Sequence, residues 1–322
     1  MKRVSVIIVN WNGCALLRKC LNSIREAGGP LVGEVIVIDN ASSDGSAEMV
    51  AVEFPEVTLV RSEQNLGFAR ANNLGLEQAS GSWLALINSD VVVHPDCFDR
   101  LAHYLEEHDR VGLVGPKVFG RDGQQQRTCR KFPTMWNTLC RSLALDLVFP
   151  KLPLLSGREM SHWSQDTHSE VEVLSGCFWM ARREAVKEVG YLDERFFIYA
   201  EDIDWCKRFW ERGWKVVLVP TATASHFDGG SSANAPLRYS VEMLRANLTY
   251  WKKYRGVPGK MMCLLLYIIH FTVRLCLLSL KRALRRNRDE ETEQKWRRSR
   301  VCLKWLVTGE KCPSERMPSD CS

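Results

Sequence analysis

Short apolar runs alternate with amphipathic stretches along the first 110 residues of this 322-residue chain. The apolar runs are rich in β-branched residues and have the length of buried strands, whereas the stretches between them repeat at helical spacing. Strands are predicted at Val4–Trp11, Glu34–Ser42, Val57–Ser62 and Ser82–Asp90, and helices at Leu16–Ala27, Ser46–Glu53, Phe68–Ala79 and Pro95–His108. The alternation indicates right-handed βαβ units and an α/β fold with a mostly parallel central sheet flanked by helices.

The pattern weakens over residues 120–170, which we interpret as a long connection with short helices. Regular patterning then resumes with a strand, two helices and a strand, at Glu172–Arg182, Glu184–Val189, Asp202–Glu211 and Trp214–Val219. From Ser240 onward the chain is predicted to be helical. We therefore expect an α/β domain over residues 1–255 and a basic amphipathic helical tail over residues 256–322.

Composition places the chain among ordinary globular proteins, with 45% hydrophobic and 25% charged residues. Its twelve cysteines are scattered and include no C-x-x-C pair, so we expect reduced thiols in a cytoplasmic protein. The first apolar run ends at Asn10 and is too short for a signal peptide.

The net charge of +6 comes from the tail. Residues 1–251 hold 27 lysines and arginines against 31 acids, whereas residues 252–322 hold 17 against 7. A basic tail behind a near-neutral body points to an anionic surface as partner. Because the tail carries no nucleic-acid-binding motif, we expect a membrane surface and no nucleic acid.

Sixteen of the twenty residues in Met261–Leu280 are apolar. Length alone permits a membrane span, but Arg274 near the middle would cost about 2.5–3.5 kcal/mol on insertion. We interpret this segment as a helix lying in the membrane interface, peripheral on the cytoplasmic face, with the KRALRRNR segment (281–288) touching anionic head groups. The alternative is a helix packed on the α/β domain or in a homodimer interface.

Polar residues end three of the predicted strands, at the sheet edge where ligands bind in α/β folds. Asp39 can accept a hydrogen bond from a ligand N–H, such as the imide of uracil or thymine, or it can form an Asx-turn. Asn88 and Asp90 point the same way, so two oxygens can converge on a hard cation such as Mg²⁺. The alternative for this pair is a strand-to-helix turn.

The stretch FFIYAEDIDWCKR crowds three carboxylates, Glu201, Asp202 and Asp204, beside large aromatic residues. Acids at a helix start suit the macrodipole, which is the structural explanation. The functional explanation is a catalytic base next to a bound cation, because crowding and burial shift carboxylate pKa values.

The motifs VSVIIVNWN, VIVIDNASSDGS, NLGFARANNLGL and LALINSDV occur in that order, followed by SGCFWMARREAVKEVGYLDERFFIYAEDIDWCKRFWERGW. Together they resemble the inverting family-2 glycosyltransferases, and most closely the rhamnosyltransferase-like branch, over about residues 3–232. The resemblance implies a GT-A fold, in which a nucleotide-binding half and an acceptor half share one sheet.

Roles for individual residues follow from this resemblance. Asp202 would be the general base, and Asp90 with His226 would hold Mg²⁺ or Mn²⁺. Asn88 occupies the first position of the family's D-x-D metal motif, where it departs from the strict pattern. The donor site would comprise Asn10, Asp39, Asp44, Gly67, Arg70 and Asn88, and the acceptor site Ser175, Gly176, Trp179 and Glu201.

The implied activity is transfer of a hexose or rhamnose from a nucleotide diphosphate donor to a hydroxyl of a glycan or lipid-linked acceptor, in cell-surface polysaccharide synthesis. The alternative is a non-catalytic carbohydrate-binding or scaffold protein on the same fold. Residue by residue, the alternatives are a structural role for His226, a solvated Arg70, a tight backbone crossing at Ser175 and Gly176, and a core position for Trp179.

Overall fold

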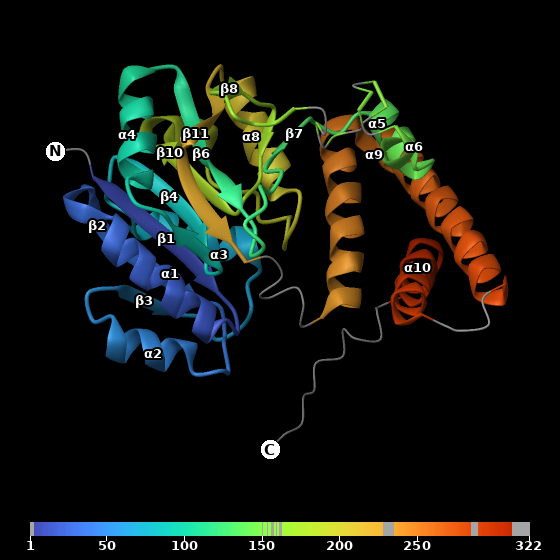
Figure 1. Cartoon of the computed structure of the whole chain (residues 1–322), viewed down its shortest axis with the longest axis horizontal. Coiled ribbons are helices and arrows are strands. Elements are labelled where there is room, and N and C mark those ends of the chain that lie inside the picture. Colours follow the sequence, from blue (N-terminus) through green and yellow to red (C-terminus); the bar gives the residue numbers. More distant parts are fainter. Residues whose placement is uncertain are drawn as a thin grey trace. The chain divides into compact units, whose positions relative to one another are not determined.

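The computed structural model describes residues 3–149, 151–152, 154–155, 158, 160, 163–227, 235–284 and 289–310. The chain forms two compact units (Figure 1). The first combines Met1–Phe132 with Arg158–Ser231, and the second combines Pro133–Gly157 with Ser232–Ser322. The predicted boundary at residue 255 remains a prediction, and each unit is described by itself below.

A nine-stranded sheet forms the centre of the first unit, with strand order β3-β2-β1-β4-β10-β6-β11-β5 and β8 paired with β11. The strands β1 to β4 are mutually parallel, as are β6 and β11, while β10 runs antiparallel between β4 and β6. Their bounds are β1 (Val4–Asn10), β2 (Val32–Asp39), β3 (Thr58–Arg61), β4 (Trp83–Asn88), β5 (Val91–Val93), β6 (Val111–Phe119), β8 (Ser169–Glu170), β10 (Phe178–Arg182) and β11 (Lys215–His226).

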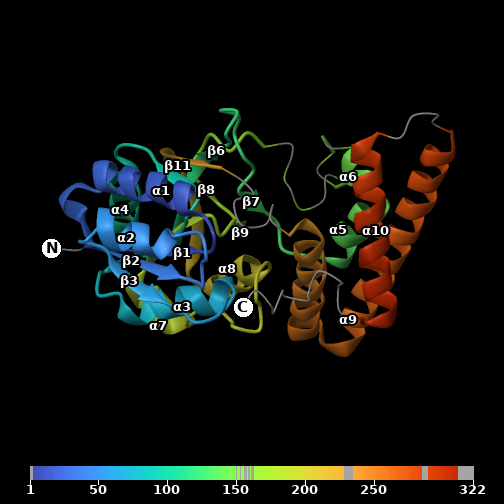
Figure 2. The same ribbon diagram turned by 90° about the horizontal axis from the view of Figure 1, so that it is seen from below.

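Both faces of β1 are buried, which explains its uninterrupted apolar sequence. One face packs against α1 and α4, and the other is approached so closely by α3 that a Cβ on Gly75 would lie 2.4 Å from Ile7 Cγ2. Figure 2 shows the helices on the two sides of the sheet. The helices of this unit are α1 (Cys14–Ala27), α2 (Ser46–Glu53), α3 (Phe68–Gln78), α4 (Cys97–Glu107), α7 (Arg183–Val189) and α8 (Glu201–Glu211).

Three details of the sheet differ from the sequence prediction. The strand β6 was not predicted, although it lies between β10 and β11, because glycine and proline interrupt its apolar pattern. The predicted strand Glu172–Arg182 is two strands, β9 (Val173–Leu174) and β10, and β9 pairs with β7 (Cys129–Arg130) in a separate ribbon. The last strand continues beyond Val219 to His226.

The second unit is helical and contains α5 (Met135–Ser142), α6 (Leu145–Val148), α9 (Pro236–Leu284) and α10 (Glu290–Thr308). A non-helical Gly256 (φ 67°, ψ −165°), two residues before Pro258, breaks α9 into two halves. The carboxyl-terminal half contacts α10 through a hydrogen bond from Lys281 Nζ to Thr292 Oγ1 (2.8 Å) and another from Trp296 Nε1 to Ser279 Oγ (3.0 Å). Residues 285–288 of the predicted head-group-binding segment, and residues 311–322, lie outside the described part of the chain.

A close backbone contact joins the start of α3 to the segment before α8. The Phe68 N–H donates to the Phe197 carbonyl oxygen at 2.6 Å. This approach requires glycine at position 67, because a Cβ there would lie 2.4 Å from the same oxygen. Gly67 also adopts φ 80° and ψ −177°, a region that is essentially restricted to glycine.

We expect the substitution Gly67→Ala to lower the free energy of unfolding by about 3 kcal/mol, since backbone strain and a steric clash add together. Gly45→Ala is the matched control. Gly45 has φ 81° but no atom within 4 Å of its added Cβ, so about 1 kcal/mol of backbone cost is expected. Chemical denaturation followed by tryptophan fluorescence measures both values, and equal losses would contradict this account of Gly67.

Candidate active site

The parallel register brings the ends of three strands to one edge of the sheet. Asn10 of β1 pairs with Asp39 of β2, and Val9 pairs with Asn88 of β4. Each of these three polar side chains carries one buried oxygen with no hydrogen-bond partner among the described residues, namely Asn10 Oδ1, Asp39 Oδ1 and Asn88 Oδ1. An unsatisfied buried acceptor costs about 1–3 kcal/mol, so three together at a strand edge indicate a place prepared for a ligand.

The two oxygens of Asp39 have different surroundings. Oδ2 accepts a hydrogen bond from the Ser42 backbone N–H at 3.1 Å, which is the turn that the sequence offered as the structural alternative. Oδ1 remains without a partner in the described structure. The turn therefore holds the carboxylate in place and leaves its other oxygen available to a ligand N–H.

Asn40 ties this edge to the loop before α3, a role that the sequence analysis did not identify. Its Oδ1 accepts from the Leu66 N–H at 2.7 Å, and its Nδ2 donates to Asn65 Oδ1 at 3.0 Å. The side chain is buried. Asn40 thus fixes the loop that leads into Gly67 relative to the end of β2.

Asp44 and Arg70 were predicted at the donor site, and the structure shows other contacts for both. The Asp44 carboxylate accepts from the backbone N–H groups of Cys14 (2.8 Å) and Ser46 (3.1 Å). Burial opposes ionisation of Asp44, but these bonds and that from the Ser46 hydroxyl outweigh it and lower its pKa. Arg70 is exposed and lies 3.9 Å from the Glu194 carboxylate. In the structure, Asp44 therefore links the first residue of α1 to the first residue of α2 through hydrogen bonds.

Asp90 and His226 meet because β5 pairs with the end of β11. The distance from His226 Nε2 to Asp90 Oδ1 is 3.2 Å, and both side chains are largely buried. On the other side of the ring, Nδ1 lies 3.0 Å from Gln126 Oε1, while Gln126 Nε2 donates to the His226 carbonyl oxygen at 3.0 Å. That second bond orients the amide so that its oxygen faces Nδ1, and Nδ1 must then be the donor.

This tautomer has a consequence for Asp90. With the Nδ1 proton directed to Gln126, the neutral ring would point the Nε2 lone pair at a carboxylate oxygen. A proton on Nε2 or a cation held with Asp90 removes that conflict. The residue types at this edge therefore fit a divalent cation, with Asn88 Oδ1 as a further oxygen donor. The described residues nevertheless gather no group of three histidine, cysteine or acidic side chains, so a cation would need ligands from substrate or water.

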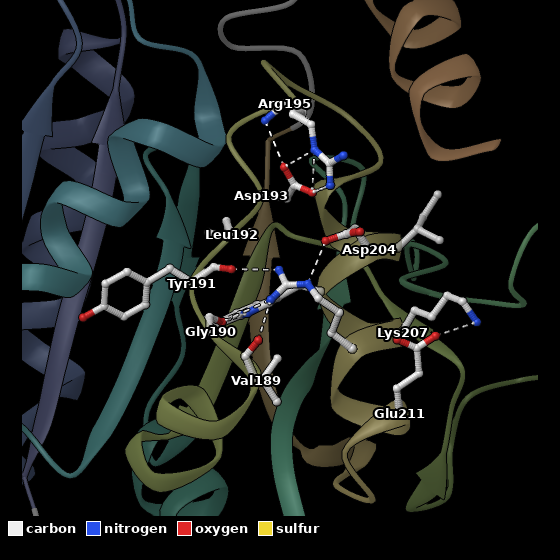
Figure 3. A network of polar contacts seen from close by, with 12 residues as sticks. Val189, Gly190, Tyr191, Leu192, Asp193, Arg195, Asp204, Lys207 and Glu211 are labelled. Atoms are coloured by element: carbon white, nitrogen blue, oxygen red, sulfur yellow. Dashed lines mark hydrogen bonds and ion pairs between the residues drawn. The ribbon is translucent and has the colours of Figure 1, made fainter. Parts of the chain in front are cut away.

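The three crowded carboxylates at the start of α8 have three different surroundings. Asp204 is fully buried and pairs with Arg208, whose Nε lies 2.9 Å from Asp204 Oδ2. Arg208 also donates to the carbonyl oxygens of Val189 (2.8 Å) and Tyr191 (2.8 Å). Figure 3 shows Asp204 beside this backbone. Asp204 is therefore structural.

Glu201 and Asp202 are buried but less completely paired. Burial raises the pKa of Glu201 well above its usual range, and the Asp202 and Asp204 carboxylates raise it further. Its Oε2 has no partner among the described residues. Asp202 Oδ1 accepts from the Ile203 N–H at 2.8 Å, and Asp202 Oδ2 faces Arg130 Nη1 at 3.8 Å. Of the two acids, Asp202 is the one that faces a cationic side chain in the described residues.

Backbone strain precedes these acids. Tyr199 and Ala200 adopt φ values of 68° and 63°, which are uncommon for residues other than glycine. Two such residues in succession are maintained only where the surrounding structure fixes them. Here the strained pair places Glu201 and Asp202 in the first turn of α8.

The segment from Gln126 to Arg130 contacts both the Asp90–His226 pair and the acids at the start of α8. Gln126 bonds His226, Arg130 faces Asp202, and the Thr128 carbonyl oxygen accepts from the Ser175 N–H at 2.7 Å. From the sequence, this region is predicted only as a connection, because it has no periodicity. Its glutamine and arginines were the available signal, but nothing in the sequence assigned their partners.

Besides Glu201, the three other residues predicted around the acceptor differ in accessibility. Ser175 and Gly176 are half-buried, so both remain candidates. The prediction for Trp179 is wrong, because its ring is fully buried, lies 5.1 Å from the Trp205 ring and donates its N–H to the Leu174 carbonyl oxygen. A Cβ on Gly176 would lie 3.2 Å from the Trp179 ring, so the tryptophan packs directly against the backbone at Gly176.

Comparison with known proteins gives this arrangement a family. The sequence profile of Glycosyl transferase family 2 matches residues 5–190. The chain belongs to this family. N-acetylglucosaminyl-diphospho-decaprenol L-rhamnosyltransferase of Mycobacterium tuberculosis is 28% identical over 242 residues, which are 72% of this chain and 78% of that protein.

Solved structures confirm the fold. The mannosyltransferase PcManGT of Pyrobaculum calidifontis, solved with GDP-Man and Mn²⁺, matches with a TM-score of 0.58 and 18% identity, over 96% of this chain and 88% of that one. GalNAc-T7, solved with UDP, GalNAc and Mn²⁺, matches with a TM-score of 0.56 and 17% identity, over 95% of this chain and 56% of that one. The predictions of a GT-A fold and a rhamnosyltransferase-like family-2 member are confirmed.

The raised pKa of Glu201 predicts a pH dependence of stability. Below the ordinary glutamate value of 4.5, Glu201 is protonated in both the folded and the unfolded chain. As the pH rises above that value, the unfolded chain ionises while the folded chain resists, so the wild type loses stability relative to the neutral variant Glu201→Gln. Denaturation of both proteins across a pH series should show this difference growing with pH.

The exposed Glu211→Gln on the same helix is the matched control for that series. It should leave the pH dependence of the wild type unchanged. A Glu201→Gln protein whose stability relative to the wild type does not depend on pH would contradict the raised pKa of Glu201.

Proposed function

We propose that this chain is an inverting glycosyltransferase that moves a sugar from a nucleotide diphosphate donor to a hydroxyl of a glycan or lipid-linked acceptor in cell-surface polysaccharide synthesis. The observation that carries the proposal is the set of three unpartnered buried oxygens where β1, β2 and β4 end. Rhamnose as the donor sugar, and a polyprenyl-diphosphate-linked sugar as the acceptor, are suggested by the name of the mycobacterial relative. Family membership does not favour the alternative of a non-catalytic scaffold.

The donor base would be bound at the end of β2. Asp39 Oδ1 is an acceptor without a partner, and the imide N–H of uracil or thymine is a donor that matches it. Asn10 Oδ1 lies at the paired position of β1 and would accept from the same nucleotide. The two side chains are held by Ser42, which receives a hydrogen bond from Asn10 Nδ2 at 3.2 Å and donates its N–H to Asp39.

The cation would be held by Asp90 and His226, with Asn88 as an uncharged oxygen donor, and it would neutralise charge on the leaving diphosphate. Gln126 fixes the His226 ring so that Nε2 faces Asp90. Mn²⁺ in the structures of PcManGT and GalNAc-T7 supports a divalent cation here.

Asp202 would act as the general base. The acceptor oxygen bonds to the anomeric carbon as the bond from that carbon to the diphosphate oxygen breaks, and the diphosphate leaves with the bonding electrons. The hydroxyl proton passes to the Asp202 carboxylate. One displacement inverts the anomeric centre and needs no covalent sugar–enzyme intermediate. Glu201, whose pKa burial raises well above its usual range, would hydrogen-bond the acceptor.

Asp202→Asn should leave donor affinity within about twofold and reduce transfer by about 10²–10⁴-fold, because it removes only the proton acceptor. Calorimetric titration with dTDP-rhamnose or UDP-sugars measures binding, and nucleoside diphosphate release with acceptor measures transfer. The exposed Glu211→Gln on α8 is the matched control and should retain activity. Transfer at the wild-type rate by Asp202→Asn would remove this residue from the mechanism.

Removal of divalent cations with EDTA should abolish transfer, and Mg²⁺ or Mn²⁺ should restore it. Asp90→Asn should raise the cation concentration for half-maximal activity about tenfold or more, because the site loses its carboxylate. Asn88→Asp should lower that concentration, because it adds a second carboxylate. Asp109→Asn, at an exposed turn, is the control and should change neither. Full activity of the wild type in EDTA would contradict the cation site.

A further inference from the structure

An exposed apolar face runs along the carboxyl-terminal half of α9. Large apolar side chains recur there every three or four residues and are between 39% and 62% exposed: Val257, Met261, Met262, Leu265, Ile269, Val273, Leu277 and Leu280. We call this set the α9 apolar face. By length and composition, α9 is also the one helix in the described residues that could cross a membrane. Apolar surface of this extent marks an interaction site.

The other side of the same helix faces protein and carries polar side chains beside the buried Cys263 and Leu266. His270 Nδ1 donates to the Ser142 carbonyl oxygen at the end of α5, at a distance of 3.2 Å. Arg274 is half-buried near Arg141 of α5 and Arg298 of α10, and burial together with these cations lowers its pKa. Arg282 lies over the Trp296 ring of α10, with 4.2 Å between its guanidinium carbon and the ring centroid. The two sides of α9 therefore have different environments.

The helix α10 decides how α9 can meet a bilayer. It packs along α9 and carries exposed charges at Glu291, Lys295, Arg297, Arg298 and Arg300. If α9 crossed the hydrocarbon core, these charges would enter it too, at a cost of several kcal/mol. A helix that lies in the interface instead keeps α10 in water and buries only the α9 apolar face.

The positive charge around the α9 apolar face indicates which kind of surface it binds. Residues 243–288 contain eleven lysines and arginines and no acidic residue. Within the described part of that stretch, Lys252 and Arg255 precede the α9 apolar face, Lys260 lies between its first two members, and Lys281 and Arg282 follow it. Lys281 lies 3.6 Å from Asp289 and Arg282 lies 3.0 Å from Glu293, so acids of the second unit partly offset these two cations. The cations Lys252, Arg255 and Lys260, beside an exposed apolar stripe, match the anionic head groups and acyl chains of an anionic bilayer surface. A second copy of the chain would bring these like charges together.

We propose that the α9 apolar face docks on an anionic lipid bilayer, with α9 parallel to the membrane plane and α10 on its aqueous side. The contact uses the second unit alone and does not depend on the sugar-transfer chemistry proposed above. Binding is expected to combine insertion of the apolar side chains with attraction of the flanking cations, and therefore to weaken at high salt.

Flotation of the full chain with vesicles tests the proposal. The protein should bind vesicles of phosphatidylcholine with phosphatidylglycerol more tightly than vesicles of phosphatidylcholine alone. The triple variant Leu265→Ser, Ile269→Ser, Leu277→Ser should lower the partition coefficient about tenfold or more. Val52→Ser, which changes a 79% exposed residue of α2, is the matched control and should not. Unchanged binding of the triple variant overturns the proposal.

A second measurement needs no change to the face. Cys276 is exposed and lies among the residues of the α9 apolar face. An environment-sensitive dye on Cys276 should shift its emission to the blue with anionic vesicles, compared with protein labelled after Cys276→Ser. Absence of that shift overturns the proposal even if the triple variant fails to fold.

Two further outcomes also count against docking parallel to the membrane. Protein that stays with membranes after carbonate extraction at high pH would indicate a span. Loss of a dimer by the triple variant, with lipid binding retained, would indicate that a second copy covers the face. Nucleoside diphosphate release with a soluble acceptor should persist in the triple variant, so a failure of docking is distinguishable from a failure of the proposed activity.

Discussion

The hydrogen bond from the Phe68 N–H to the Phe197 carbonyl oxygen joins the two halves of the candidate site. On one side, Asn40 fixes the loop before Gly67 to the end of β2, where Asp39 lies. On the other side, Phe197 precedes the strained pair that starts α8 and places Asp202. The bond is short, at 2.6 Å, and exists only because position 67 has no side chain. The end of β2 and the start of α8 are therefore held together by a backbone contact, beside which Arg70 and Glu194 form an exposed pair at 3.9 Å.

A second connection runs through the segment that contains Gln126 and Arg130. Gln126 orients His226 beside Asp90, and Arg130 is the cation that faces Asp202. Asn88 leaves the strand edge with less negative charge than a pair of aspartates would, and the nearby arginine adds positive charge. Both features reduce the negative potential that an incoming diphosphate would meet.

The parts of this structure that the sequence predicted are those with local signals. Apolar runs predicted β1, β2 and β4, and their polar last residues predicted the edge where the unpartnered oxygens lie. The strand β6 was missed because Gly112, Gly115 and Pro116 remove its strand pattern, although pairing with β10 and β11 compensates for them. The contacts of Gln126 and Arg130 depend on tertiary structure alone. Trp179 was misassigned because the sequence around Ser175 and Gly176 does not show whether the tryptophan ring faces a ligand or the core.

The segment from residue 189 to residue 197 makes many backbone contacts with its neighbours. Arg208 donates hydrogen bonds to the carbonyl oxygens of Val189 and Tyr191. Asn73 Nδ2 donates to the Leu192 carbonyl oxygen at 2.9 Å, and the Leu192 N–H donates to Asn73 Oδ1 at 3.0 Å. Moving this segment would break all of these hydrogen bonds at once, so we expect it to be rigid rather than a mobile loop. Altering the shape of this segment would then take substitutions of its side chains rather than changes in loop length.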